Sequence, residues 1–205
     1  MRECRKCAGI LKKYNVEPRP IFSGGAQHPI FLLGQAPGVS EYNSGKPFQG
    51  AAGKSVRNLF SSCGLKSFDD VVYQTSVTKC FPGRLAKASS DRKPGVSEVV
   101  NCASFLRRQL EIVNPRLMVC LGGLAWQTAL GLLEQERAGF LEHDLGLKRP
   151  NQVKVLDVVG RVFRWRSTTV IPMIHPSGSA NGARSEHPDL DQLSKKLLAE
   201  NLIDF

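Results

Sequence analysis

The stretch Ile30-Phe31-Leu32-Leu33-Gly34-Gln35-Ala36-Pro37-Gly38 decides the fold of this chain. A short continuous apolar run that ends in glycine is typical of a parallel strand buried on both faces. Two further runs also lead into turns: residues 71–77 lead into Thr78-Lys79-Cys80, and residues 168–174 lead into His175-Pro176-Ser177-Gly178. Ligands of open α/β sheets bind outside the carboxyl ends of the strands, which is where all three turns are expected.

The pattern between these runs predicts an α/β fold. Helices are expected over residues 54–63, 99–112, 124–133 and 189–202, and a further strand over residues 117–121. Strands that alternate with helices predict a single three-layer α/β/α domain over residues 1–205, with a central, mainly parallel sheet of about four strands. Pro172 predicts an edge or bulged position for the last strand. Two runs on either side of Gly160, residues 153–156 and 162–165, predict a hairpin.

The charge of the chain favours a polyanionic partner. Its 28 Lys and Arg residues exceed its 18 Asp and Glu residues, which gives a net charge of +10. Basic proteins gain affinity for nucleic acid by releasing its counterions. The polar segment 81–95 is too long for a simple connection and carries Arg84, Lys87, Arg92 and Lys93; a second basic group is Arg161, Arg164 and Arg166. A merely soluble basic surface explains the charge equally well.

No segment of the sequence predicts a membrane span or a secretory signal. The apolar runs are far shorter than the ~20 residues that a spanning helix needs, and the N-terminus has no apolar core of a signal peptide. We therefore expect a cytoplasmic protein without membrane contact, and a monomer.

Gly53-Lys54-Ser55 matches the end of a phosphate-binding loop, but the rest of that motif is missing. Such a loop needs a glycine five residues before its Gly-Lys pair, and this position is Phe48. The sequence therefore argues against nucleoside-triphosphate hydrolysis.

Four of the six cysteines are candidate metal ligands. Cys4 and Cys7 form a C-x-x-C pair, and Cys80 and Cys102 can approach it from a strand end and a helix start. Cys63 and Cys120 fit buried core thiols better. Zinc and an iron–sulfur cluster fit this spacing equally well.

These motifs, in this order, resemble the uracil-DNA glycosylase superfamily, and specifically its iron–sulfur-containing family 4 branch. The turn 34–38 is similar to the family's Gly-Glu-Ala-Pro-Gly turn, Gly45-Lys46-Pro47-Phe48-Gln49-Gly50 to its Gly-Arg-Pro-Phe-x-Gly segment, and Ile174-His175-Pro176-Ser177 to its His-Pro-Ser loop. The resemblance covers most of the chain. It implies a DNA glycosylase that hydrolyses the N-glycosidic bond of a flipped-out pyrimidine, in base-excision repair or in the removal of foreign modified bases.

The resemblance also implies a structural [4Fe–4S] cluster, rather than zinc, on Cys4, Cys7, Cys80 and Cys102. It assigns to His175 a hydrogen bond to the oxygen of the departing base. It makes Phe48 a stacking platform for that base. The resemblance also places Gly34, Ala36 and Gly38 of the turn 34–38 in the pocket that binds the substrate. Phosphates would be contacted by Arg84, Lys87, Arg92 and Lys93, and Arg184 would wedge into the duplex.

Three departures from the family pattern bear on the substrate. Gln35 stands where the family has an acid, so it can position a water but cannot take its proton. Ser76 stands where the family has the asparagine that reads the base edge, and Gly38 leaves the space near C5 of the base open. We therefore expect uracil or a modified, 5-substituted pyrimidine as substrate. The alternatives are a catalytically weak or inactive DNA-binding relative and a zinc-stapled nucleic-acid-binding protein.

Overall fold

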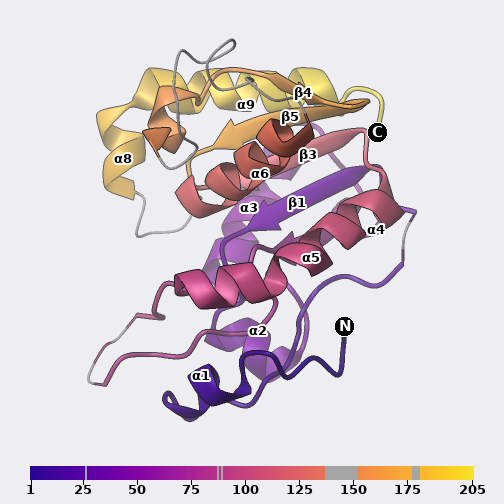
Figure 1. The fold of residues 1–205 in the computed structure, drawn as a ribbon. Helices are drawn as coiled ribbons and strands as arrows, with labels where there is room; N and C mark the ends of the chain where they lie inside the picture. Colours follow the sequence, from indigo (N-terminus) through magenta and orange to yellow (C-terminus); the bar gives the residue numbers. More distant parts are fainter. Residues whose placement is uncertain (26, 87, 89, 137–151, 177–180) are drawn as a thin grey trace.

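A computed structural model describes all 205 residues except 26, 87, 89, 137–151 and 177–180 (Figure 1). Five strands form one sheet in the order β2-β1-β3-β5-β4. Strands β1 (Ile30–Gly34), β2 (Val72–Ser76), β3 (Leu117–Leu121) and β5 (Thr168–Met173) are parallel, and only β4 (Phe163–Trp165) runs antiparallel to its neighbour. The mainly parallel α/β sheet is confirmed, with five strands instead of about four.

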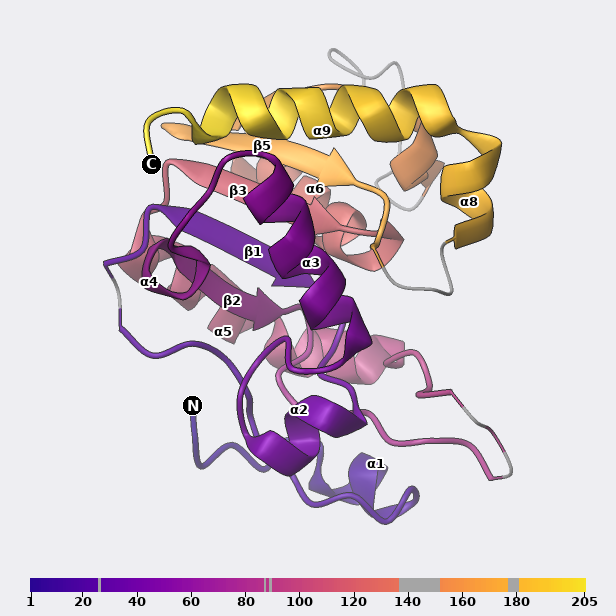
Figure 2. The same cartoon turned by 180° about the vertical axis from the view of Figure 1, so that it is seen from behind.

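Helices cover both faces of the sheet, which gives the predicted three layers (Figures 1 and 2). One face packs against α5 (Val96–Val113) and α6 (Gly123–Glu136), and the other against α3 (Ala51–Ser62), α4 (Phe68–Val71) and α9 (Pro188–Leu202). Side chains of β1 alternate between the two: Phe31 and Leu33 join the first core, and Ile30 and Leu32 the second. Both faces are buried, so β1 and β3 are continuous apolar runs, whereas β2 also carries the buried polar residues Gln74, Thr75 and Ser76.

The hairpin predicted around Gly160 is wrong. Residues Val155–Asp157 form a short 3₁₀ helix, η2, and β4 pairs with β5 through the turn at Arg166. The reason is the spacing of the buried residues: Val153 and Val158 both pack into the core but are five residues apart, which does not match the period of two of a strand.

Pro172 lies in β5, which has neighbours on both sides. The shorter β4 reaches only as far as Val170 along it, so beyond that point β5 pairs with β3 alone. A residue without an N–H is tolerated where one side of a strand is unpaired. The expected edge position therefore holds only for this end of the strand.

A third, smaller core lies beside β2 at the N-terminal end of the chain. Helices α1 (Ala8–Lys12) and α2 (Val39–Ser44) lie together there, below the sheet in Figure 1. Its buried members are Cys7, Leu11, Val16 and Phe81. Near the other end of the chain, the short α8 (Asn181–Glu186) precedes α9. In the part of the chain that the structure describes, no helix is long and apolar enough to cross a membrane.

Candidate active site

A cavity of about 430 Å³ lies at the carboxyl ends of β1, β2, β3 and β5. Parallel strands bring the turns that follow them to one sheet edge, which places distant motifs around a single space. The residues that the sequence analysis assigned to the base or to the reaction all line this cavity: Gly34, Gln35, Ala36, Gly38, Phe48, Ser76 and His175. Their chemical roles remain predictions.

Phe48 forms one wall in a strained backbone conformation. Its φ of +51° lies in the left-handed region, which costs a residue with a side chain of this size about 1–3 kcal/mol. The ring lies against β1, since a Cβ on Gly34 would be 3.0 Å from Phe48 Cζ. A larger residue at position 34 would therefore push the ring away from the strand.

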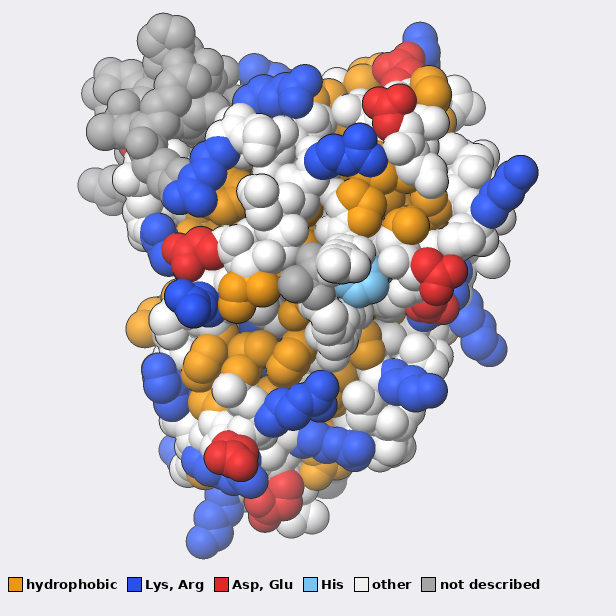
Figure 3. Space-filling view, turned by 90° about the vertical axis from the view of Figure 1, so that its right-hand side faces the viewer, with side chains coloured by type: hydrophobic (Ala, Val, Ile, Leu, Met, Phe, Trp, Pro, Cys, Tyr) orange, Lys and Arg blue, Asp and Glu red, His pale blue; other side chains and the backbone are white. Residues whose placement is uncertain are grey.

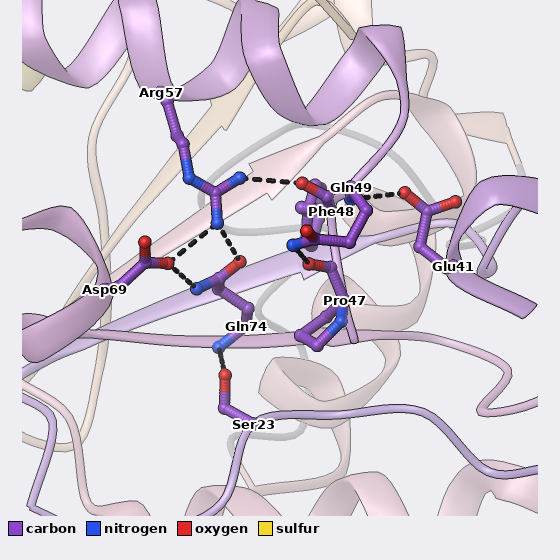
Figure 4. A network of polar contacts seen from close by, with 8 residues as sticks. All are labelled: Ser23, Glu41, Pro47, Phe48, Gln49, Arg57, Asp69 and Gln74. Atoms are coloured by element: carbon purple, nitrogen blue, oxygen red, sulfur yellow. Dashed lines mark hydrogen bonds and ion pairs between the residues drawn. The ribbon is translucent and has the colours of Figure 1, made fainter. Parts of the chain in front are cut away.

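Arg57 holds the backbone of Phe48 from behind (Figure 4). Its Nη1 donates to the Phe48 carbonyl at 2.7 Å, and its Nη2 donates to Asp69 Oδ1 at 2.7 Å and lies 3.5 Å from Gln74 Oε1. Gln74 Nε2 donates to the same Asp69 oxygen, and the backbone N–H of Gln74 donates to Ser23. The strained wall of the cavity is thus fixed by a guanidinium anchored to the sheet.

Gly53, the glycine of the Gly-Lys-Ser tripeptide, is also explained by Phe48. A Cβ on Gly53 would lie 1.9 Å from the Phe48 carbonyl oxygen, so α3 can pack here only with a glycine. The tripeptide therefore serves close packing of a helix on a loop.

Glu41 joins the two turns of the cavity. Its Oε2 accepts from the N–H of Gly38 at 2.9 Å, and its Oε1 accepts from the N–H groups of Gln49 at 2.6 Å and Gly50 at 2.8 Å. A carboxylate that accepts three backbone N–H groups fixes the geometry of both segments. From the sequence, Glu41 is an acid beyond the turn, and its role in joining the two segments was not predicted.

His175 lies on the turn after β5 and is mostly buried. Gly122, with φ of +82°, packs on it: a Cβ there would be 3.3 Å from His175 Cβ. Burial and, next, the charge of Arg184 lower the pKa of His175 below its usual value. The imidazole is therefore neutral at pH 7 and offers one N–H.

The side chain of Arg184, the predicted wedge, turns back toward this site. Its Nη1 donates to the carbonyl of His175 at 3.0 Å. Residues 177–180 of the same loop lie outside the described part of the chain.

Two side chains stand directly in front of Gly38, the residue expected to leave space near C5 of the base. A Cβ on this residue would lie 2.9 Å from Asp91 Oδ2 and 2.9 Å from Glu41 Oε2. Two carboxylates therefore occupy the space in front of the turn. Ser76 is buried, and its Oγ lies 3.4 Å from the position of a Gly34 Cβ.

The basic segment 81–95 borders the cavity with charges that are partly used within the protein. Arg92 donates to both carboxylate oxygens of Glu98 at 2.7 and 2.8 Å, lies over the Tyr14 ring and is only 9% exposed, so it serves the fold in this structure. Arg84 pairs with Asp91 at 2.7 Å. Lys93 lines the cavity, and Lys87 lies outside the described residues. Elsewhere on the surface, Lys and Arg side chains are spread across the face that Figure 3 shows, which fits a basic surface as well as a binding patch.

The four candidate ligand cysteines line a second, small cavity beside the third core: Cys4, Cys7, Cys80 and Cys102. No group of three or more Cys, His, Asp or Glu side chains in the described residues stands at metal-binding distances. Two donors point at the sulfur atoms: the N–H of Lys79 at Cys102 and the side-chain amide of Asn101 at Cys7, each at 3.4 Å.

One basic side chain, Lys79, is buried next to these thiols. Lys79 is fully buried, donates to Thr75 and to the Ser76 carbonyl, and has Cys102 as a neighbour. Burial lowers the pKa of Lys79 to about 7 and raises the pKa of Cys80 to about 12. Thiolates bound to a metal would offset the buried ammonium. Cys120, by contrast, is a buried core thiol as predicted.

Comparison with known proteins gives consistent matches. The family model described as the uracil DNA glycosylase superfamily matches residues 22–198. A Type-4 uracil-DNA glycosylase of Archaeoglobus fulgidus is 36% identical over 175 residues, which cover 85% of this chain and 76% of the relative. One of Thermotoga maritima is 30% identical over 86% of this chain and 78% of the relative. A Type-5 uracil-DNA glycosylase of Pyrobaculum aerophilum is 37% identical over 54% of this chain and 52% of the relative.

Proposed function

This chain belongs to the uracil DNA glycosylase superfamily, and on that premise we propose that it hydrolyses the N-glycosidic bond of uracil or a modified pyrimidine in DNA. The observation that carries the proposal is the shared cavity: Phe48, Ser76 and His175 come from three distant segments and line one space beside a turn of the family's type. An aromatic face, a hydroxyl and a buried imidazole suit a flipped base.

In the proposed reaction, the bond between C1′ of the sugar and N1 of the base breaks, and its electron pair leaves with the base. His175 donates its N–H to the base oxygen on which the negative charge develops. Its lowered pKa makes this donor a neutral imidazole near pH 7. Phe48 holds the base by stacking, and Gln35 positions the water through its amide.

The substrate range follows from Ser76. A serine hydroxyl is shorter than the amide of an asparagine and forms fewer hydrogen bonds, so it leaves room at the base edge. The names of the similar proteins support uracil as the substrate. We propose that modified pyrimidines are accepted as well, with a role in base-excision repair or against foreign modified DNA.

The cluster of this proposal is a [4Fe–4S] centre held by Cys4, Cys7, Cys80 and Cys102. When bound, it supplies a structural cross-link and no reaction step. The lining of one cavity by all four thiols and the buried ammonium of Lys79 support it. Cys4 and Cys7 of the N-terminal segment would then be linked to Cys80, at the start of the basic loop, and to Cys102.

DNA contacts are proposed for the basic loop next to the cavity. Lys93 is best placed to meet a phosphate, with Arg84 and Lys87 further along the loop, while Arg184 borders the His175 turn. Such contacts position the duplex and carry no sequence information. We propose a cytoplasmic, monomeric, single-domain protein.

A base-release assay tests the function. Single- and double-stranded DNA carrying uracil, 5-substituted uracils or modified cytosines is incubated with protein, and the free base and abasic DNA are quantified. We expect release from wild type, a loss of roughly 100-fold in His175→Ala, and a shift toward plain uracil in Ser76→Asn. Tight DNA binding without release from any substrate would instead support the inactive DNA-binding relative.

A further inference from the structure

Carboxylates are scarce in the candidate active site. Among the described residues that line the cavity, the acids are Glu41 and Asp91, and residue 35 is a glutamine. Hydrolysis needs a group that accepts the proton of the attacking water, and a neutral amide cannot do so. One of these two carboxylates is therefore the natural candidate.

Glu41 is committed to the loops of the cavity. Its two oxygens accept three backbone N–H groups at 2.6–2.9 Å. A carboxylate offers about four lone-pair positions, so three are used. Its protonation would also weaken the contacts that hold the two turns together.

Asp91 can accept more further hydrogen bonds than Glu41 can. Its Oδ1 accepts from Arg84 Nε at 2.7 Å, and its Oδ2 accepts from the N–H of Val39 at a longer 3.2 Å. The side chain is 30% exposed. Two lone-pair positions therefore remain on a carboxylate that borders the cavity, and water can reach it.

The position of Asp91 relative to the turn is defined. Its Oδ2 lies 2.9 Å from where a Cβ of Gly38 would be, so it stands against the turn that contains Gln35. The absence of a side chain at Gly38 is what lets the loop carboxylate come this close. A different loop thus brings a carboxylate to the turn in which residue 35 carries none.

The loop holds Asp91 in this place. A backbone bridge joins Arg84 and Asp91, and the N–H of Arg92 donates to the Gly83 carbonyl at 3.0 Å. The next side chain, Arg92, is anchored to the buried Glu98. Catalytic groups need such support, because a misplaced one loses most of its effect.

We propose that Asp91 orients and deprotonates the attacking water, which is the task of the acid that Gln35 replaces. The inference rests on the proposed function. The C1′–N1 bond breaks and its electron pair leaves with the base; the water oxygen bonds to C1′ and its proton goes to the Asp91 carboxylate. The proton then passes to the base anion, so that the products are the free base and the abasic sugar.

The test compares rates of base release in single turnover, with protein in excess over uracil-containing DNA. Asp91→Asn keeps the shape of the side chain and an oxygen that can accept from Val39, but it removes the proton acceptor. We expect its rate to fall by roughly 100-fold or more, the usual range for a general base. Stability should fall only slightly, because only the part-exposed ion pair with Arg84 is lost. Affinity for DNA with an uncleavable analogue should be unchanged or tighter. Asp189→Asn, an exposed aspartate of α9, is the matched control and should keep the wild-type rate.

Rescue separates a role in the reaction from a role in the fold. Gln35→Glu in the Asp91→Asn background, or formate added to Asp91→Ala, should restore much of the rate. The inference is overturned if Asp91→Asn stays within a few-fold of wild type, if its loss matches a loss of stability or DNA affinity, or if neither carboxylate restores the rate. A wild type that releases no base would overturn the proposed function as well, whereas an active wild type with an equally active Asp91→Asn would overturn this inference alone.

Discussion

Replacing Arg57 by alanine should destabilise the protein and loosen the wall of the cavity at once. The guanidinium makes a 2.7 Å hydrogen bond to the Phe48 carbonyl, and hydrogen bonds to charged groups contribute roughly 1.5–3 kcal/mol. It also lies over the Phe68 ring at 5.0 Å, which adds about 0.5–1 kcal/mol.

The ion pair adds little to this sum. Asp69 is 67% exposed, and pairs of this kind contribute about 0–1 kcal/mol. We therefore expect Arg57→Ala to lower the free energy of unfolding by roughly 2–4 kcal/mol. Because Phe48 holds a positive φ against its own preference, its ring should also lose its fixed place.

Urea unfolding measures the loss of stability in Arg57→Ala, and base release measures the effect of the loosened cavity wall. Stacking on an aromatic side chain is worth roughly 1–3 kcal/mol per base, so release at low substrate concentration should fall about tenfold or more. Asp69→Asn is the control: it removes the ion pair, leaves the hydrogen bond to Phe48 and should cost less than about 1 kcal/mol. If both variants lose the same stability, the brace on Phe48 is not what Arg57 contributes, and the reasoning is refuted.

Three further predictions concern the packing, the thiols and pH. Gly53→Ala should lower the free energy of unfolding by at least about 1–3 kcal/mol in thermal or urea unfolding, because its Cβ would meet the Phe48 carbonyl. Gly131→Ala in α6, with open space around it, should raise this free energy by up to about 1 kcal/mol. Equal effects would contradict the packing of Gly53 on Phe48. Single replacements by serine should remove bound iron and visible colour from protein purified without air when they are made at Cys4, Cys7, Cys80 or Cys102, while Cys120→Ala should retain both. A colourless wild type that holds zinc would exclude the iron–sulfur centre. Because the pKa of His175 is lowered, the folded protein binds fewer protons than the unfolded chain, so its contribution to stability should be complete above pH 6.5 and fall as the pH drops below it. The slope of stability against pH should be smaller in His175→Gln. Identical slopes would show that His175 does not titrate differently on folding.

The sequence by itself determined the layers and the gathering of the pocket motifs. The strands around Leu33 and Val119 are buried on both faces and are continuous apolar runs, which can be recognised locally. Since carboxyl ends of parallel strands share one edge, the turns at Gly34 and His175 could be placed in one site before any coordinates were known.

Only the tertiary structure decided which polar side chains serve the fold and which face the cavity. Arg92 appeared to be a phosphate contact, but its charge is paired with Glu98; Asp91 appeared to be one acid in a basic loop, but it reaches Val39, 52 residues away. Hydrophobic periodicity is a local property of the chain. The partner of a charged side chain depends on which distant backbone the packed core brings within about 3 Å, and no local pattern encodes that distance.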